Sequence, residues 1–230
     1  MPSLDVGTAY LSTLARGGVG LSVTALGARP ARPLELYEFE ACPFCRKVRE
    51  ALSMLDLEAT VYPCPKGGTR FRGEVKRRGG KLQFPYLVDP NAGVEMYESD
   101  AIVRHLFARY GDGSVPAALR PGALTQLSLT LASLARGAKG VRQRPSHAPE
   151  KPLELYSFEA SPYCRIVREE LCALELPYHL HNVARGSPSR EAFRARSGRM
   201  QVPYLVDPNT GTALFESADI VRYLESTYAA

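Results

Sequence analysis

The chain has no tryptophan, few cysteines and no long apolar run. No segment of its 230 residues approaches the roughly 20 apolar residues of a membrane-spanning helix, so we expect no membrane span. The five cysteines are an odd number in a long chain, which does not fit the disulfide framework of a secreted domain. The net charge of +5 is too small to indicate a nucleic-acid partner. With 23% charged and 45% hydrophobic residues, the composition excludes a disordered chain.

The N-terminal region contains an uncharged segment, residues 17–27, that is similar to the apolar core of a signal peptide. A signal peptide carries positive charge before that core, whereas here Asp5 comes early and Arg16 is the first basic residue. The segment also returns in mid-chain, where LASLARGAKG (131–140) resembles LSTLARGGVG (11–20). We therefore expect it to belong to a folded, cytoplasmic protein, with a cleaved organelle-targeting segment as the alternative.

The chain consists of two copies of one unit. PLELYEFEACPFCRKVREAL (33–52) and PLELYSFEASPYCRIVREEL (152–171) share 15 of 20 residues. PYLVDPNAGVEMYESDAIVRHL (85–106) and PYLVDPNTGTALFESADIVRYL (203–224) share 14 of 22. The offset is 119 residues in the first block and 118 in the second. Self-similarity at a fixed offset predicts a tandem architecture.

Each copy has the pattern of a small α/β unit. An alternating segment predicts a strand, and Pro43 suits the first turn of the helix that follows it. A second strand, a basic Gly-rich stretch with a short helix, a hairpin and a last helix complete the unit. In copy 1 we expect the strands and the two longer helices at 34–39, 43–56, 58–62, 84–89, 94–97 and 98–109. In copy 2 we expect the elements at 153–158, 162–174, 178–183, 188–196, 202–207, 212–215 and 216–228.

Three signatures occur in the same order in both copies. They are CPFC after the first strand (SPYC in copy 2), Pro-Tyr-Leu opening the third strand, and Glu-Ser opening the last helix. In this combination the unit resembles the thioredoxin superfamily, specifically glutaredoxins and the N-terminal domain of glutathione S-transferases. We expect no counterpart of the all-helical domain that follows this domain in the transferases, since each copy stops after its last helix and the linker between the copies is too short to replace it.

The resemblance implies an α/β fold of two tandem thioredoxin-like (glutaredoxin-like) domains. Each is expected to be a mixed four-stranded sheet flanked by helices, with an extra helical segment before it. The expected boundaries are an N-terminal helical segment at 1–32, domain 1 at 33–111, a linker and helical segment at 112–151, and domain 2 at 152–230.

The resemblance also implies a glutathione site in each copy, with glutathione as a cosubstrate. A cis proline is expected to present the preceding backbone to the cysteine moiety of glutathione. The Glu-Ser pair is expected to hold the γ-glutamyl end at a helix N-terminus, which favours a carboxylate. The expected binding residues are Phe84, Pro85, Glu98 and Ser99 in copy 1, and Val202, Pro203, Glu216 and Ser217 in copy 2. Copy 2 reads ESADI where copy 1 reads ESDAI, which moves an acidic residue of this motif by one position.

Cys42 and Cys45 are the candidate catalytic residues. Cys42 precedes Pro43 and therefore lies at the N-cap of the first helix, where the dipole, with Arg46 and Lys47 nearby, is expected to favour the nucleophilic thiolate. Cys45 lies one turn further, where it can attack a mixed disulfide on Cys42. We interpret the pair as a redox dithiol. The alternatives are inert thiols, half of a zinc site, or an iron–sulfur cluster shared between chains, as in some glutaredoxin-like proteins.

Copy 2 has Ser161 in place of the nucleophilic cysteine and retains only Cys164. A hydroxyl cannot act in disulfide exchange, so this copy is expected to be degenerate. Ser161 either caps the helix or hydrogen-bonds a bound glutathione thiolate, as in serine-type transferases. Cys64 is expected to be incidental, and Cys172 to be a small buried residue.

A basic stretch precedes the proline in each copy. Most of its cations are expected to form a solvated face, whereas Lys81 or Gln83, nearest the proline in copy 1, is expected to hold the glycine carboxylate of glutathione.

The sequence thus predicts a glutaredoxin-type thiol–disulfide oxidoreductase that is active in domain 1 only. Its partners would be glutathione and a disulfide or glutathionylated protein. One alternative is a non-catalytic glutathione-binding, redox-sensing or protein-docking module. A further alternative is a glutathione transferase or isomerase acting on a small electrophile. The oligomeric state does not follow from the sequence.

Overall fold

The computed structural model describes residues 3–137 and 139–230, and it has the α/β fold that the repeats predict. Repeat 1 contains β1 (Leu34–Glu38), α2 (Pro43–Met54), β2 (Ala59–Pro63), α3 (Arg72–Gly79), β3 (Tyr86–Asp89), β4 (Val94–Met96) and α4 (Ser99–Tyr110). Repeat 2 contains β5 (Leu153–Ser157), α6 (Pro162–Ala173), β6 (Tyr178–Asn182), α7 (Ser189–Ser197), β7 (Tyr204–Asp207), β8 (Thr212–Phe215) and α8 (Ser217–Tyr228). The helices before the repeats are α1 (Ser3–Leu14) and α5 (Ala123–Leu134), and a short 3-10 helix, η1 (Ala117–Leu119), precedes α5.

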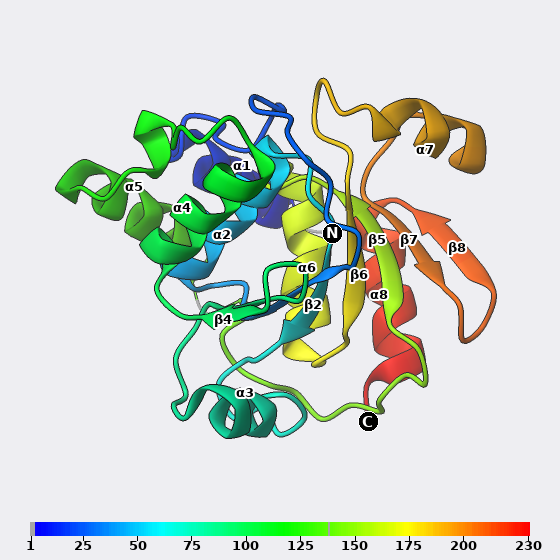
Figure 1. Ribbon diagram of the computed structural model, residues 1–230. Helices are drawn as coiled ribbons and strands as arrows, with labels where there is room; N and C mark the ends of the chain where they lie inside the picture. Colours follow the sequence, from blue (N-terminus) through cyan, green and yellow to red (C-terminus); the bar gives the residue numbers. More distant parts are fainter. Residues whose placement is uncertain (1–2, 138) are drawn as a thin grey trace.

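The two four-stranded sheets join at their edges into one eight-stranded sheet with the order β4-β3-β1-β2-β6-β5-β7-β8 (Figure 1). Within each repeat the first two strands are parallel and the hairpin strands are antiparallel. The joint is an antiparallel pair, β2 with β6, in which Ala59 lies opposite Leu180 and Val61 opposite Tyr178. Because the strand order is symmetric about this joint, a pseudo-twofold axis between β2 and β6 relates the repeats. The joint also removes one exposed edge from each sheet.

The helices before the repeats pack across this axis. Helix α1 packs against α6 of repeat 2, and α5 packs against α2 of repeat 1. The hydroxyl of Thr13 on α1 donates to the carbonyl of Ala160, next to the second motif, at 3.0 Å. The helix of each expected segment therefore packs on the motif helix of the other repeat. No helix in the described part of the chain is long and apolar enough to cross a membrane.

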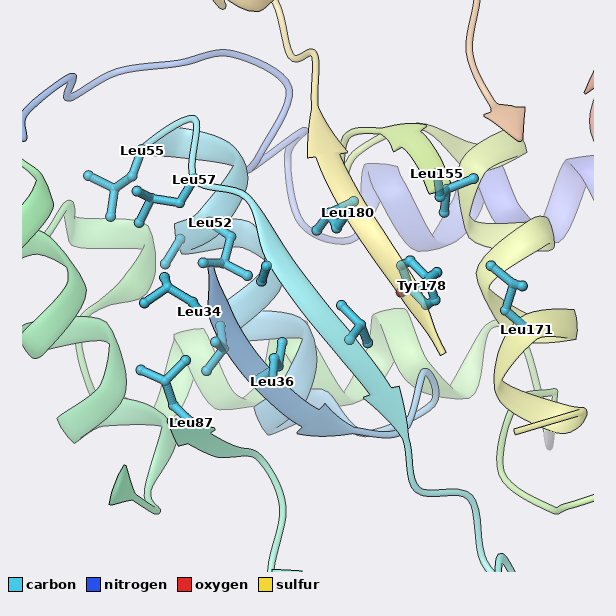
Figure 2. Close-up of a cluster of buried hydrophobic side chains, with 14 of the residues drawn as sticks. Leu34, Leu36, Leu52, Leu55, Leu57, Leu87, Leu155, Leu171, Tyr178 and Leu180 are labelled. Atoms are coloured by element: carbon cyan, nitrogen blue, oxygen red, sulfur yellow. The ribbon is translucent and has the colours of Figure 1, made fainter. Parts of the chain in front are cut away.

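One apolar core runs through both repeats. Figure 2 shows Leu36 and Leu52 of repeat 1 in the same buried cluster as Leu155, Leu171 and Leu180 of repeat 2. Burying each such leucine contributes about 1.5–3 kcal/mol. The repeats are consequently joined by hydrophobic burial as well as by strand pairing.

A buried Arg–Glu network lies across the pseudo-twofold axis on the helical side of the joint. Arg49 of α2 donates to Glu159 of repeat 2 at 3.0 Å, and Arg168 of α6 donates to Glu40 of repeat 1 at 3.1 Å. Ser12 of α1 accepts hydrogen bonds from an arginine of each repeat. The charged members are Arg16, Glu38, Glu40, Arg46, Arg49, Glu50, Arg136, Glu159, Arg165, Arg168 and Glu169. All are buried, so they must be paired within the protein.

Glu159 shows how strongly the network is paired. Burial raises the pKa of its carboxyl, but the guanidinium groups of Arg168, Arg49 and Arg46 outweigh that effect and hold the pKa at about 2. Glu159 is therefore ionised at neutral pH. Removing its charge would leave buried cations without their shared partner.

We predict that Glu159→Gln lowers the free energy of unfolding by about 3–5 kcal/mol, the usual result of breaking a buried ion pair on one side. Urea unfolding monitored by circular dichroism measures the change. Asp219→Asn, which removes one partner of the exposed Asp219–Arg222 pair, is the control and should leave the midpoint nearly unchanged. A loss in Glu159→Gln no larger than in the control would contradict a role of the network in holding the repeats together.

Candidate functional site

Cys42 lies where the sequence predicts, at the N-cap of α2. Its backbone is extended, with φ of −73° and ψ of 122°, and Pro43 begins the helix. The Cys42 Sγ accepts a hydrogen bond from the backbone N–H of Cys45 at 3.4 Å. This is the interaction that a capping side chain makes with the free N–H groups of a helix start. The sulfur is thus held at the positive end of α2.

The environment of Cys42 favours the thiolate. The pKa of the Cys42 thiol is lowered, chiefly by the hydrogen bond from the Cys45 thiol, with a further contribution from backbone N–H groups. Burial acts in the opposite direction, as does the charge of Glu38. Cys45 itself is fully buried, and burial raises the pKa of its thiol well above the ordinary value. The two thiols therefore differ in the way that a nucleophile and a resolving thiol require.

The two cationic side chains next to the motif, Arg46 and Lys47, pair with carboxylates. Arg46 donates to Glu50 at 3.0 Å within the buried network, and Lys47 pairs with Asp100 of α4. The expectation that these side chains stabilise the thiolate is therefore corrected: hydrogen bonds at the start of α2 lower the pKa of Cys42. The sequence could not indicate this, because the carboxylates that attract the cations come from distant positions and from the next helical turn.

A small cavity of about 200 Å³ opens beside the first motif. Most of the residues that the sequence analysis predicts to bind glutathione in repeat 1 line this cavity. Its lining residues are Phe44, Gln83, Phe84, Pro85, Glu98 and Ser99. The Phe84–Pro85 peptide bond is cis, as the resemblance implies. Gln83 donates its side-chain amide to the carboxylate of Glu98 at 2.5 Å, so these two polar groups meet at the cavity.

The Glu-Ser pair stands at the start of α4. Glu98 is the N-cap, with φ of 69°, and Ser99 is the first helical residue. The free N–H groups and partial positive charge of a helix start suit a carboxylate. The exposed carboxylate of Glu98 suits an ammonium group at the same place. Together they form a polar end of the cavity that matches an α-amino acid group.

Lys81 lies outside the cavity lining. Its Nζ sits 4.7 Å from the centre of the Tyr97 ring, and the Tyr97 hydroxyl donates to the Lys81 carbonyl at 2.8 Å. Several other cations of the basic stretch have structural contacts. Arg70 donates to the carbonyls of Leu174 and Glu175 in repeat 2, and Arg78 pairs with carboxylates on β1 and β4. Arg70 and Arg78 therefore depart from the solvated face that the sequence predicts for this stretch, because both are half-buried and contact the protein.

Repeat 2 has a matching cavity of about 320 Å³, and the motif beside it has Ser161 where repeat 1 has Cys42. Its lining residues are Tyr163, Gln201, Val202, Pro203, Glu216 and Ser217. The Val202–Pro203 bond is cis, and Gln201 donates to Glu216 as Gln83 does to Glu98. Ser161 Oγ accepts from the backbone N–H of Cys164 at 3.2 Å, which confirms the capping interpretation. The cavity therefore keeps its form although Ser161 stands where repeat 1 has Cys42.

Three cavity residues were absent from the sequence prediction: Phe44, Tyr163 and Gln201. The first two are the variable third residues of CPFC and SPYC. Gln201 is the counterpart of Gln83 at the repeat offset of 118, so the alignment of the two copies contained the signal for it.

The remaining cysteines are buried, and none of them forms a disulfide bond. Burial raises the pKa of Cys64 and of Cys172. The Cys172 thiol lies between the backbone N–H of Glu40 and the carbonyl of Gly140, as a small buried residue. Within residues 3–137 and 139–230, no group of three or more His, Cys, Asp or Glu side chains is arranged to hold a metal ion.

We predict that Cys45→Ala raises the pKa of Cys42, because the variant removes the thiol hydrogen bond that lowers it most. Cys45→Ser keeps a hydroxyl donor and should raise the pKa less. The pH dependence of Cys42 alkylation by iodoacetamide, followed by peptide mass spectrometry, gives both values. Cys64→Ser is the control and should leave the Cys42 pKa unchanged. Equal pKa values in the wild type and Cys45→Ala would refute this account.

Comparison with known proteins agrees with the repeat structure. No curated protein matches the chain. Among solved structures, a trimeric glutathione transferase, Leishmania TDR1, matches over 87% of this chain and 68% of its own, with 15% sequence identity and a TM-score of 0.31. The family model described as "Glutathione S-transferase, N-terminal domain" matches twice, at residues 36–114 and 155–230. The chain therefore belongs to the family of the glutathione S-transferase N-terminal domain, of which it carries two copies.

Proposed function

We propose that the protein is a glutathione-linked thiol–disulfide oxidoreductase of glutaredoxin type, with its redox-active site in repeat 1. The observation that carries this proposal is the state of Cys42, a thiol with a lowered pKa at the N-cap of α2. A thiolate, and not a thiol, attacks a disulfide. The two-copy family membership supports glutathione as the partner thiol.

The proposed reaction begins with attack of the Cys42 thiolate on a disulfide R–S–S–R′. A bond forms between Cys42 and one sulfur, the S–S bond breaks, and the other sulfur leaves as a thiolate. Either Cys45 attacks Cys42 Sγ and releases the second sulfur as a thiolate, or, where that sulfur belongs to glutathione, free glutathione attacks it, so that Cys42 leaves as a thiolate and glutathione disulfide forms. In the first case glutathione afterwards reduces the Cys42–Cys45 disulfide and is itself oxidised to glutathione disulfide.

The cavity beside the motif is suited to glutathione. The N-terminus of α4 and the carboxylate of Glu98 form a polar end that can bind the α-amino acid group of the γ-glutamyl residue. The backbone at Phe84 is expected to pair with the cysteine moiety. Gln83 is placed to orient the carboxylate of Glu98 through its 2.5 Å hydrogen bond.

A non-catalytic role is the second candidate for repeat 2. Its cavity keeps the proline, the Gln201–Glu216 contact and the start of α8. Ser161 has replaced the nucleophilic sulfur, so the site would bind glutathione without disulfide exchange. Equilibrium binding of glutathione to Cys42→Ser, compared with the same variant carrying Glu216→Ala, tests this candidate.

We predict that Cys42→Ser reduces glutathione-coupled turnover of a small mixed disulfide to the uncatalysed background. Cys45→Ser should retain turnover, because glutathione can resolve the mixed disulfide on Cys42. The assay couples glutathione disulfide formation to NADPH oxidation by glutathione reductase.

Ser161→Ala serves as the matched control, since it removes the equivalent side chain from repeat 2, and it should retain wild-type turnover. Equal turnover rates for the wild type and Cys42→Ser would contradict the proposed mechanism. Loss of turnover in Ser161→Ala as well as in Cys42→Ser would mean that activity does not reside in repeat 1 alone.

A further inference from the structure

Helices α1 and α5 carry most of the large apolar side chains that the molecule exposes. Among the described residues eleven such side chains are exposed, and seven of them lie on these two helices. Single exposed leucines are ordinary on a protein surface, whereas a group of them marks a surface that another molecule covers. We call this group the leucine face. It consists of Tyr10, Leu11 and Leu14 of α1 and Leu124, Leu127, Leu131 and Leu134 of α5.

The leucines of α5 form one stripe along the helix. They are spaced three, four and three residues apart, and they are 50% to 83% exposed. This spacing places them on one side of the helix, in the pattern by which one helix packs on another in a coiled coil. The opposite side of α5, with Leu129 and Ala132, is buried against the rest of the protein. The stripe is therefore a second packing surface, which the described part of the chain leaves open.

Helix α1 continues the leucine face. Leu11 and Leu14 are the counterparts of Leu131 and Leu134 at an offset of 120 residues, and they are exposed as well. The two helices pack on each other, and the hydroxyl of Ser12 donates to a carbonyl of α5 at 2.6 Å. A groove of about 530 Å³ lies between α5, η1 and the residues that follow α1, and three of the α5 leucines line it. The stripes on the two helices thus form one surface with a groove in it.

The leucine face has no unpaired charge. Helix α5 contains no charged residue, and the only one in α1, Asp5, pairs with Arg136 and Lys139. Helices that lie on a membrane surface carry lysine and arginine on their polar side, whereas the polar residues of α5 are serine, threonine and glutamine. The leucine face therefore fits an apolar protein surface better than a layer of lipid headgroups.

A second copy of this chain offers an apolar surface of the right size. The seven residues of the leucine face expose on the order of 600 Å² of apolar surface, at the upper end for a monomer. A stable interface buries about 800 Å² on each partner, including a polar rim, and interfaces between identical copies are the more apolar ones. A twofold axis brings the same face of two copies together, so leucines of one copy can enter the spaces between leucines of the other.

We propose that the leucine face is a homodimer interface, in which α1 and α5 of two copies form a four-helix bundle. The groove beside α5 receives apolar side chains of the partner. Tyr10, at the margin of the leucine face, packs edge-on against Tyr163 of the repeat 2 cavity, with 6.0 Å between the ring centres. The partner copy would therefore border the cavity of repeat 2. This proposal does not depend on the proposed function.

Sedimentation velocity of the full chain tests the proposal. Over a concentration range of about 1–100 μM we expect the wild type to sediment as a dimer. In Leu127→Glu/Leu131→Glu we expect a dissociation constant at least about 100-fold higher, because the interface would bury unpaired carboxylates. The matched control is Leu82→Glu, which changes an exposed leucine outside the leucine face and should leave the dimer unchanged. Since Leu127 and Leu131 are exposed, the circular dichroism spectrum should be the same in all variants.

A charge-complementation experiment separates loss of the interface from damage to the fold. Leu127→Lys/Leu131→Lys should be monomeric by itself. Mixing it with Leu127→Glu/Leu131→Glu should restore a dimer, because cations of one copy then face anions of the other. A surface that packs on its own copy gives this result, whereas a surface for another protein does not.

The following outcomes would overturn the proposal. One is a wild-type chain that is monomeric over the whole concentration range. Another is a dimer that persists in Leu127→Glu/Leu131→Glu, or that is lost equally in Leu82→Glu. A third is the absence of association when the glutamate and lysine variants are mixed. Co-sedimentation of a monomeric wild type with phosphatidylcholine vesicles would assign the leucine face to a membrane surface instead.

Discussion

The cross-paired arginines Arg49 and Arg168 are the constraint on which the arrangement of this molecule depends. Each belongs to the helix that follows the thiol motif of its own repeat, and each donates to a glutamate of the other repeat. Burial of charge is unfavourable unless every ion has its partners. The two repeats therefore satisfy each other's charges. Neither would have a complete set of partners alone.

This constraint positions the candidate sites. Helices α2 and α6 carry the motifs at their first turns and the arginines one to two turns later. The ion pairs that Arg49 and Arg168 form with glutamates of the other repeat fix both helices relative to the joined sheet. The helices α1 and α5 add to this, since each packs on the motif helix of the other repeat. The orientation of each motif thus depends on both halves of the chain.

The two sites share a form and differ in chemistry. Both have a capped helix start, a cis proline and an amide–carboxylate contact beside a cavity. Repeat 1 adds two thiols and a buried carboxylate, whereas repeat 2 has hydroxyls at the positions of Cys42 and Glu38. Because a hydroxyl caps a helix well, repeat 2 keeps its fold with Ser161 at the position of Cys42. This accounts for a chain in which one copy retains the dithiol and the other retains the scaffold.

The sequence by itself determined the two-copy α/β fold, the helix start at Cys42 and most of the cavity residues. These follow from local signals: the repeat, strand alternation, the proline after the motif and the Glu-Ser pair at the last helix. Only the tertiary structure decided that β2 pairs with β6, that α1 and α5 exchange partners, and that Arg46 and Lys47 turn away from the thiolate. Strand pairing at sheet edges and the choice of ion partner depend on which distant groups meet in space. A charged residue on a helix has the same appearance in the sequence whether its side chain faces water or a buried carboxylate. For the same reason Glu38 looks like an ordinary strand residue in the sequence, and only the fold pairs it with Arg49.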